Sequence, residues 1–147
     1  MSTLSTANIE SKAANTPPVI KDLNGTECGQ FARAWIVFDG TSASIGTGED
    51  SFNISGVTDN GTGDYTIAFS NALPSANYVV AGMVANTSDG FSTSLAGDTR
   101  GISGIHIKGS TAPTTSSFTV KTRYGSTSGS NGAVADFSRV YVVVFGG

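Results

Sequence analysis

The chain is poor in charge, cysteine and histidine. Charged residues make up 13% of its 147 residues, about half the share of roughly 25% found in ordinary globular domains. Cys28 is the only cysteine and His106 the only histidine, so an internal disulfide is excluded and a zinc site of Cys and His ligands has too few members. The eight basic residues form no cluster, which argues against nucleic-acid binding. We expect no cofactor, no bound metal and no nucleic-acid partner.

Long apolar runs are also missing. No segment approaches the roughly 20 apolar residues that a membrane-spanning helix requires. The first residues, Met-Ser-Thr-Leu-Ser-Thr, contain neither the basic region nor the apolar region of a secretory signal. We therefore expect no membrane insertion and no export signal in this stretch.

The residues that are abundant favour strands over helices. The chain contains 19 glycines, 20 serines and 18 threonines. Glycine costs about 1 kcal/mol in a helix interior, and serine and threonine compete for the hydrogen bonds of a helical backbone. Thr, Val, Tyr and Phe favour the pleated backbone of a strand. A chain of this length can bury a core without disulfides, so the composition predicts one all-β domain.

Composition changes near residue 31. Residues 1–30 are polar, include a Pro-Pro pair at 17–18, and have only scattered apolar side chains, too few to build a core. We interpret residues 1–30 as an extended N-terminal arm and residues 31–147 as the folded domain. The apolar residues through which the arm could attach to a partner are Leu4, Ile9, Val19 and Ile20.

From residue 31 onward, apolar runs alternate with turn clusters at the spacing expected of a β-sandwich or barrel. We predict strands at residues 32–39, 51–58, 64–70, 77–85, 102–108, 117–124 and 138–145. The predicted fold is an antiparallel β-sandwich, jelly-roll-like, of about 7–8 strands.

The second and third predicted strands form the clearest local unit. Apolar residues alternate with polar ones on both, and residues 59–64, Asp-Asn-Gly-Thr-Gly-Asp, tolerate the positive φ angles of a tight turn. This predicts a β-hairpin. The same acidic residues could be interpreted as a calcium loop, but the later bidentate Glu of such a loop is missing.

Three of the predicted strands are apolar on both faces. Residues 34–38, 78–84 and 140–145 have apolar side chains at successive positions, and successive side chains point to opposite faces of a sheet. A sandwich covers only the inner face, so an identical subunit is the favoured cover for the outer one. The alternative is a closed domain whose own loops or arm cover it. The candidate core or subunit-interface residues are Trp35, which we expect to be largely buried, together with Phe38, Tyr141, Val143 and Phe145.

Motifs for catalysis are weak. His106 alternates with isoleucines within residues 105–108, so its side chain should point to solvent, and no Gly-x-Ser-x-Gly elbow is present. A glycosidase needs a pair of carboxylates, and the candidates occur in turn-like sequence without an aromatic cluster; they are Glu49, Asp50, Asp59 and Asp64. We expect that the protein is not an enzyme.

One part of the chain resembles a known group of proteins. The strings are RAWIVFDGT at residues 33–41, SFNISGVTDNGTGDYTIAF at 51–69 and ALPSANY at 72–78. Together they resemble a module of tail-fibre-like virion proteins of tailed bacteriophages, including marine and short-tailed ones. The resemblance covers about residues 31–80. It departs at Ile45-Gly46, where the family often has Ile-Arg, so no role of that arginine transfers.

The resemblance implies a component of the virion, commonly a homotrimer and commonly at the host-facing end of the particle. On this basis the arm would attach to other virion proteins, and loops of the domain would meet a host cell-surface glycan or protein. The candidate receptor-facing residues are Asn86, Asp89, Phe91, Arg100, Ser126 and Asn131. The alternative is a capsid decoration or cement protein without a receptor-binding role, which the short chain favours because a reaching fibre usually needs a shaft.

Overall fold

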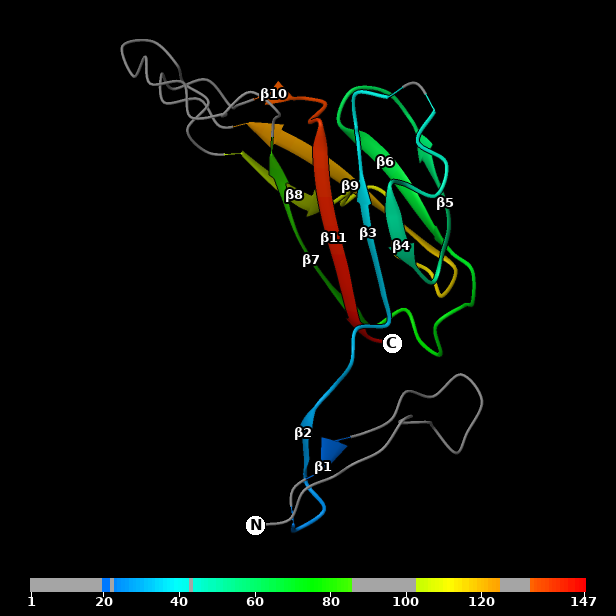
Figure 1. Cartoon of the computed structure of the whole chain (residues 1–147), viewed down its shortest axis with the longest axis vertical. Coiled ribbons are helices and arrows are strands. Elements are labelled where there is room, and N and C mark those ends of the chain that lie inside the picture. The colour runs from blue at the N-terminus through cyan, green and yellow to red at the C-terminus, as the bar shows by residue number, and fades with distance from the viewer. Residues whose placement is uncertain (1–19, 22, 43, 86–102, 125–132) are drawn as a thin grey trace, which may run out of the picture.

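The structure is a computed structural model, and it describes residues 20–21, 23–42, 44–85, 103–124 and 133–147. These residues form two antiparallel sheets packed face to face as a sandwich (Figure 1). The predicted all-β sandwich is confirmed. Within the described part of the chain, no helix is long and apolar enough to cross a membrane.

The chain crosses back and forth between the two sheets, so that each sheet combines strands that are distant in sequence. The four-stranded sheet has the order β4-β3-β11-β7, and the five-stranded sheet has β9 at its centre, paired with β6, β8 and β10, and β5 beyond β6. The four-stranded sheet comprises β3 (Ala34–Phe38), β4 (Asp50–Phe52), β7 (Tyr78–Ala85) and β11 (Arg139–Gly146). The five-stranded sheet comprises β5 (Ile54–Asp59), β6 (Asp64–Phe69), β8 (Ser103–Ile107), β9 (Ser117–Tyr124) and β10 (Ala133–Val134).

The core lies between the sheets and is formed by every second residue of the strands. β3 and β11 contribute one face of it, and β6 and β9 the other. Its largest side chains meet as aromatic pairs, with ring centroids 5.1 Å apart for Phe38 and Tyr65 and 5.5 Å apart for Phe69 and Phe118. Edge-to-face and tilted contacts of this kind add stability beyond the apolar area that they bury.

Most predicted strands match observed ones, and residues 117–124 match β9 in both bounds. The prediction of one strand over residues 51–58 is wrong. Asn53 interrupts it with a φ of 56°, so that β4 joins one sheet and β5 the other. Asparagine tolerates this left-handed conformation, and the side-chain Nδ2 of Asn53 donates to the carbonyl oxygens of Arg33 (3.1 Å) and Asn71 (3.2 Å).

The predicted hairpin is confirmed by the antiparallel pairing of β5 and β6. In its turn, the backbone N–H of Asn60 donates to the carbonyl oxygen of Asp64 over 2.8 Å. Asp59 accepts the N–H of Gly61 on Oδ1, also over 2.8 Å. Gly61 and Gly63 have positive φ angles of 115° and 60°, which explains why glycine occupies both positions.

The described part of the arm forms a small hairpin of its own beyond one end of the sandwich (Figure 1). β1 (Ile20–Lys21) pairs with β2 (Glu27–Gly29) around a turn in which Gly25 has a φ of 82°. Within the arm that the sequence predicted, this local pairing forms at Asn24-Gly25, which is itself a turn signal. Ile20 is 46% exposed. The other candidate attachment residues, Leu4, Ile9 and Val19, lie outside the described residues.

Candidate functional site

The outer face of the four-stranded sheet is apolar across all four strands. In antiparallel pairing, residues directly opposite each other point to the same face. Trp35 on β3 lies between Phe52 on β4 and Val143 on β11. One step along the strands, Tyr141 on β11 lies between Val37 on β3 and Met83 on β7. We call the surface made by Trp35, Val37, Phe52, Val79, Ala81, Met83, Tyr141, Val143 and Phe145 the apolar outer face.

Much of the apolar outer face is open to solvent in the single chain. The exposed fraction is 53% for Phe52 and 65% for both Val79 and Met83. Tyr141 and Phe145 are each 37% exposed, while Trp35, Val37 and Val143 are half-buried between their neighbours. Isolated exposed apolar residues are common on protein surfaces, but a contiguous set of this kind usually marks an interaction surface.

The structure separates the five candidate core or interface residues into two groups. Phe38 is fully buried between the sheets. Of the two alternatives for Trp35, the core is excluded, because its position on β3 points away from the core and its side chain is half-buried in the single chain; a subunit contact stays a prediction for it. Tyr141, Val143 and Phe145 share that outer face, where a subunit contact stays a prediction. Phe52, Val79 and Met83 were not singled out from the sequence, although β7 was recognised as apolar on both faces.

Charged side chains lie at the ends of the apolar outer face. Arg139 forms an ion pair with Glu49, and Asp50, which pairs with Val37, lies at the same end. Arg33 precedes β3 at the other end, where its backbone N–H donates to the carbonyl oxygen of Val144. An apolar centre with charges at its edge is the usual anatomy of a protein interface.

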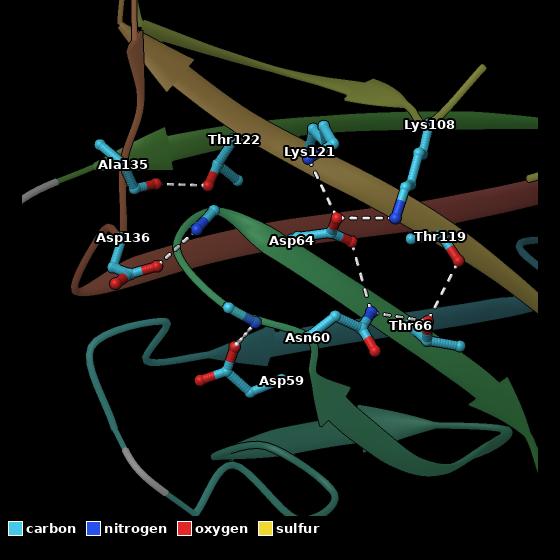
Figure 2. A network of polar contacts seen from close by, with 12 residues as sticks. Asp59, Asn60, Asp64, Thr66, Lys108, Thr119, Lys121, Thr122, Ala135 and Asp136 are labelled. Atoms are coloured by element: carbon cyan, nitrogen blue, oxygen red, sulfur yellow. Dashed lines mark hydrogen bonds and ion pairs between the residues drawn. The ribbon is translucent and has the colours of Figure 1, made fainter. Parts of the chain in front are cut away.

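The outer face of the five-stranded sheet is polar. The hydroxyls of Thr66 and Thr119 hydrogen-bond across β6 and β9 over 3.1 Å, and Lys108 and Lys121 converge on one carboxylate, that of Asp64 (Figure 2). Their Nζ atoms lie 2.8 Å and 3.0 Å from Asp64 Oδ2. The two sheets therefore present surfaces of opposite character.

The carboxylate at the centre of this network, Asp64, is buried. Its burial alone would raise the pKa of the carboxyl group, but hydrogen bonds from Lys108, Lys121 and Asn60 outweigh burial and hold the pKa below its ordinary value. Asn60 Nδ2 donates to Asp64 Oδ1 over 3.3 Å. The ionised form of Asp64 therefore joins the β5–β6 turn to β9 and to the segment after β8.

We expect the Asp64 network to stabilise the fold in a pH-dependent way. Because the folded pKa of Asp64 is lowered, its contribution is complete above the ordinary Asp pKa of 3.8 and is lost as the pH falls through the folded value. Replacing Asp64 by asparagine should cost about 2 kcal/mol at pH 7 and flatten the decline of Tm below pH 4. The exposed Asp50→Asn variant is the control, and an equal response of both variants would contradict the prediction.

A second polar cluster holds the turn of the β5–β6 hairpin against the segment before β11. Asp136 Oδ1 accepts hydrogen bonds from the Tyr65 hydroxyl and from the Gly63 N–H, each over 2.6 Å. Burial, and then the nearby Asp136 carboxylate, raise the pKa of Tyr65 far above its ordinary value, so the phenol stays a neutral donor. Thr122 Oγ1 also donates to the carbonyl oxygen of Ala135. The cluster connects parts of the chain that are distant in sequence, which is a structural role.

The side chains that could have supported catalysis are dispersed. His106 is exposed on β8, as its alternation with isoleucines predicted, while Glu49 and Asp64 are engaged in ion pairs. In the described ranges, no three His, Cys, Asp or Glu side chains come together as metal ligands. The candidate receptor-facing residues Asn86, Asp89, Phe91, Arg100, Ser126 and Asn131 all lie outside the described residues.

Comparisons of the chain with models of known protein families, with curated proteins and with solved structures found no match.

Proposed function

We propose that the protein is a structural component of a bacteriophage virion, a tail fibre or host-facing surface fibre that attaches to the particle through its N-terminal arm. The first support for this function is the sequence resemblance. The strings at residues 33–41, 51–69 and 72–78 resemble tail-fibre-like virion proteins. They fold here into β3, the β5–β6 hairpin and the start of β7, so the resemblance covers elements of both sheets.

The apolar outer face is the observation that carries the proposal. Phe52, Val79 and Met83 are each more than half exposed in the single chain. Proteins that act as monomers rarely expose a large contiguous apolar surface of this kind. A virion protein acts as part of an assembly in which such a surface is covered. We propose a homotrimer, in keeping with the resemblance, joined by its arm to other virion proteins and able to meet a host-surface glycan or protein.

A capsid decoration or cement protein is the second candidate. The described residues form one sandwich and one small hairpin, without the elongated shaft that a reaching fibre needs. In this case the same arm and the same outer face would serve assembly alone. Electron microscopy of particles that carry a labelled copy of the full chain distinguishes the two: label on the tail supports the fibre, and label over the capsid surface supports decoration.

We expect deletion of residues 1–30 to abolish incorporation into the particle while leaving the sandwich folded. The deletion removes both strands of the arm hairpin and ends before β3 begins at Ala34, so the core of the sandwich keeps all its residues. Incorporation is measured by immunoblot of purified particles, and folding by circular dichroism and the melting temperature. Particles that still contain the truncated protein would contradict the role of the arm.

A further inference from the structure

We infer that the outer face of the five-stranded sheet binds a carboxylated polysaccharide through Lys121 and Arg123. The inference rests on the proposed fibre, and it adds the chemical class of the host-surface ligand and the face that binds it. The apolar outer face belongs to the other sheet, so a partner that covers the apolar outer face leaves this polar face accessible.

The pairing of β6, β8 and β9 gathers positive charge that is dispersed in the sequence. Lys121 and Arg123 are two residues apart on β9 and therefore point to the same face. Lys108, which follows β8, reaches the same face, where its Nζ contacts Asp64 (Figure 2). Three cations and one carboxylate give the described strands a net charge of three minus one, or +2, on this face. The whole chain, in contrast, has a net charge of −3.

Part of this positive charge is available to an external anion. Asp64 receives both lysine ammonium groups on one oxygen, Oδ2, and a single carboxylate neutralises only one of them. The side chain of Lys121 is 30% exposed. Because an ammonium group has three N–H donors, Lys121 can keep its contact with Asp64 and bind a second carboxylate. Arg123 is exposed, and no carboxylate among the described residues forms an ion pair with it.

Gly104 leaves the backbone of β8 uncovered beside Arg123. The two residues are directly opposite each other on β8 and β9, and a Cβ built on Gly104 meets nothing within 4 Å in the described part of the chain. The φ angle of Gly104 is not positive, so neither the backbone conformation nor crowding requires glycine there. Glycine inside a strand weakens it and often marks a place where a ligand approaches the backbone. The open position gives a sugar ring room to contact the sheet next to Arg123.

The groups around the two cations favour a carboxylated sugar over other anions. The planar guanidinium of Arg123 matches the two oxygens of a carboxylate, and the face already binds one carboxylate, that of Asp64, through Lys121. The exposed His106 ring lies directly opposite Lys121, where it can hydrogen-bond to sugar hydroxyls. Two available cations are too few for the series of phosphate contacts through which proteins bind DNA.

The test measures binding of the full-length protein to immobilised polygalacturonate, a polymer of carboxylated sugars, and to uncharged dextran. We expect the wild type to bind only polygalacturonate. Binding should fall between about 0.1 M and about 1 M salt, because the screening length shrinks from about 10 Å to about 3 Å. Lys121→Gln/Arg123→Gln should weaken binding about tenfold through the loss of two exposed ionic contacts. Lys21→Gln/Arg33→Gln removes the same charge outside this sheet and should bind like the wild type.

Gly104→Val is a second variant, and it keeps every charge of the face. Valine favours a strand, so the melting temperature should stay the same or rise. The valine side chain covers the open position beside Arg123, so binding to polygalacturonate should weaken. A Gly104→Val variant that binds like the wild type would overturn the placement of the ligand next to Gly104.

Failure of this inference is distinguishable from failure of the proposed function. A wild type that does not bind polygalacturonate, or a Lys121→Gln/Arg123→Gln variant that binds like its control, overturns the inference, while label on the tail in electron microscopy still supports the fibre. Equal or tighter binding to inorganic polyphosphate or to DNA shows attraction to any polyanion and overturns the carboxylated class. Binding to polygalacturonate combined with label over the capsid supports the site and overturns its role in a fibre.

Discussion

Replacement of Phe118 by alanine is expected to lower the free energy of unfolding by about 3–5 kcal/mol, a large part of the 5–15 kcal/mol typical of a domain. Phe118 is 1% exposed, and its ring lies against those of Phe69 and Tyr78, with centroid separations of 5.5 Å and 5.9 Å. Its truncation would leave a cavity where β6, β7 and β9 meet. Urea denaturation followed by tryptophan fluorescence and circular dichroism measures the change.

The matched control is Trp35→Ala. It removes a larger ring, but from the outer face of the four-stranded sheet, which points away from the core. Trp35 is half-buried on the apolar outer face and does not belong to the core, so its truncation creates no internal cavity. Both substitutions are made in the Val79→Asp/Met83→Asp background, which would remove the proposed contact between subunits from the measurement, and are followed by circular dichroism. A cost for Trp35→Ala equal to that for Phe118→Ala would contradict the placement of Trp35 outside the core.

Replacement of Gly63 by alanine is expected to have the second largest effect, a decrease of about 2–4 kcal/mol in the free energy of unfolding. Gly63 has a φ of 60°, a left-handed conformation that costs alanine about 1–2 kcal/mol. A Cβ built there would also lie 2.6 Å from the carbonyl oxygen of Thr122 and 2.9 Å from the backbone nitrogen of Ala135. Neither backbone atom can move without disturbing β9 or the hydrogen bond from the Gly63 N–H to Asp136.

Gly46→Ala is the control for Gly63→Ala, because it introduces the same backbone strain without the steric overlap of the added Cβ. Gly46 has nearly the same φ, 58°, and a Cβ built there meets nothing within 4 Å. Its substitution should cost about 1–2 kcal/mol at most, and thermal denaturation of the two variants side by side gives the difference. Equal melting temperatures would show that the turn of the β5–β6 hairpin relaxes away from β9.

The β5–β6 hairpin and β9 show how much of the fold was predictable from the sequence. Alternating apolar residues and a turn rich in Asn and Gly act over a few residues, so their signal is present in any short window. Asn53 shows the limit. Its left-handed φ is stabilised by hydrogen bonds to Arg33 and Asn71, which are 20 and 18 residues away, and no local pattern indicates such partners.

The candidate site was predictable only in part. The doubly apolar character of β3, β7 and β11 was visible in the sequence, and it correctly indicated apolar side chains on the outer face as well as in the core; the subunit that would cover the outer face stays a prediction. Phe52 was not recognised as a member of this surface, because residues 51–58 were interpreted as one strand. Its membership follows from the pairing of β4 with β3, a contact that depends on the break at Asn53.

The sequence by itself determined the all-β class, the position of most strands and the two-sided apolar character of three of them, because composition and period-two alternation are local properties. The tertiary structure decided which sheet each strand joins and therefore which side of each strand becomes core. Trp35 and Phe38 are three residues apart on one strand and both apolar, yet Trp35 lies half-buried on the outer face and Phe38 is fully buried between the sheets. Burial depends on what packs against a face, and only the opposing sheet supplies that.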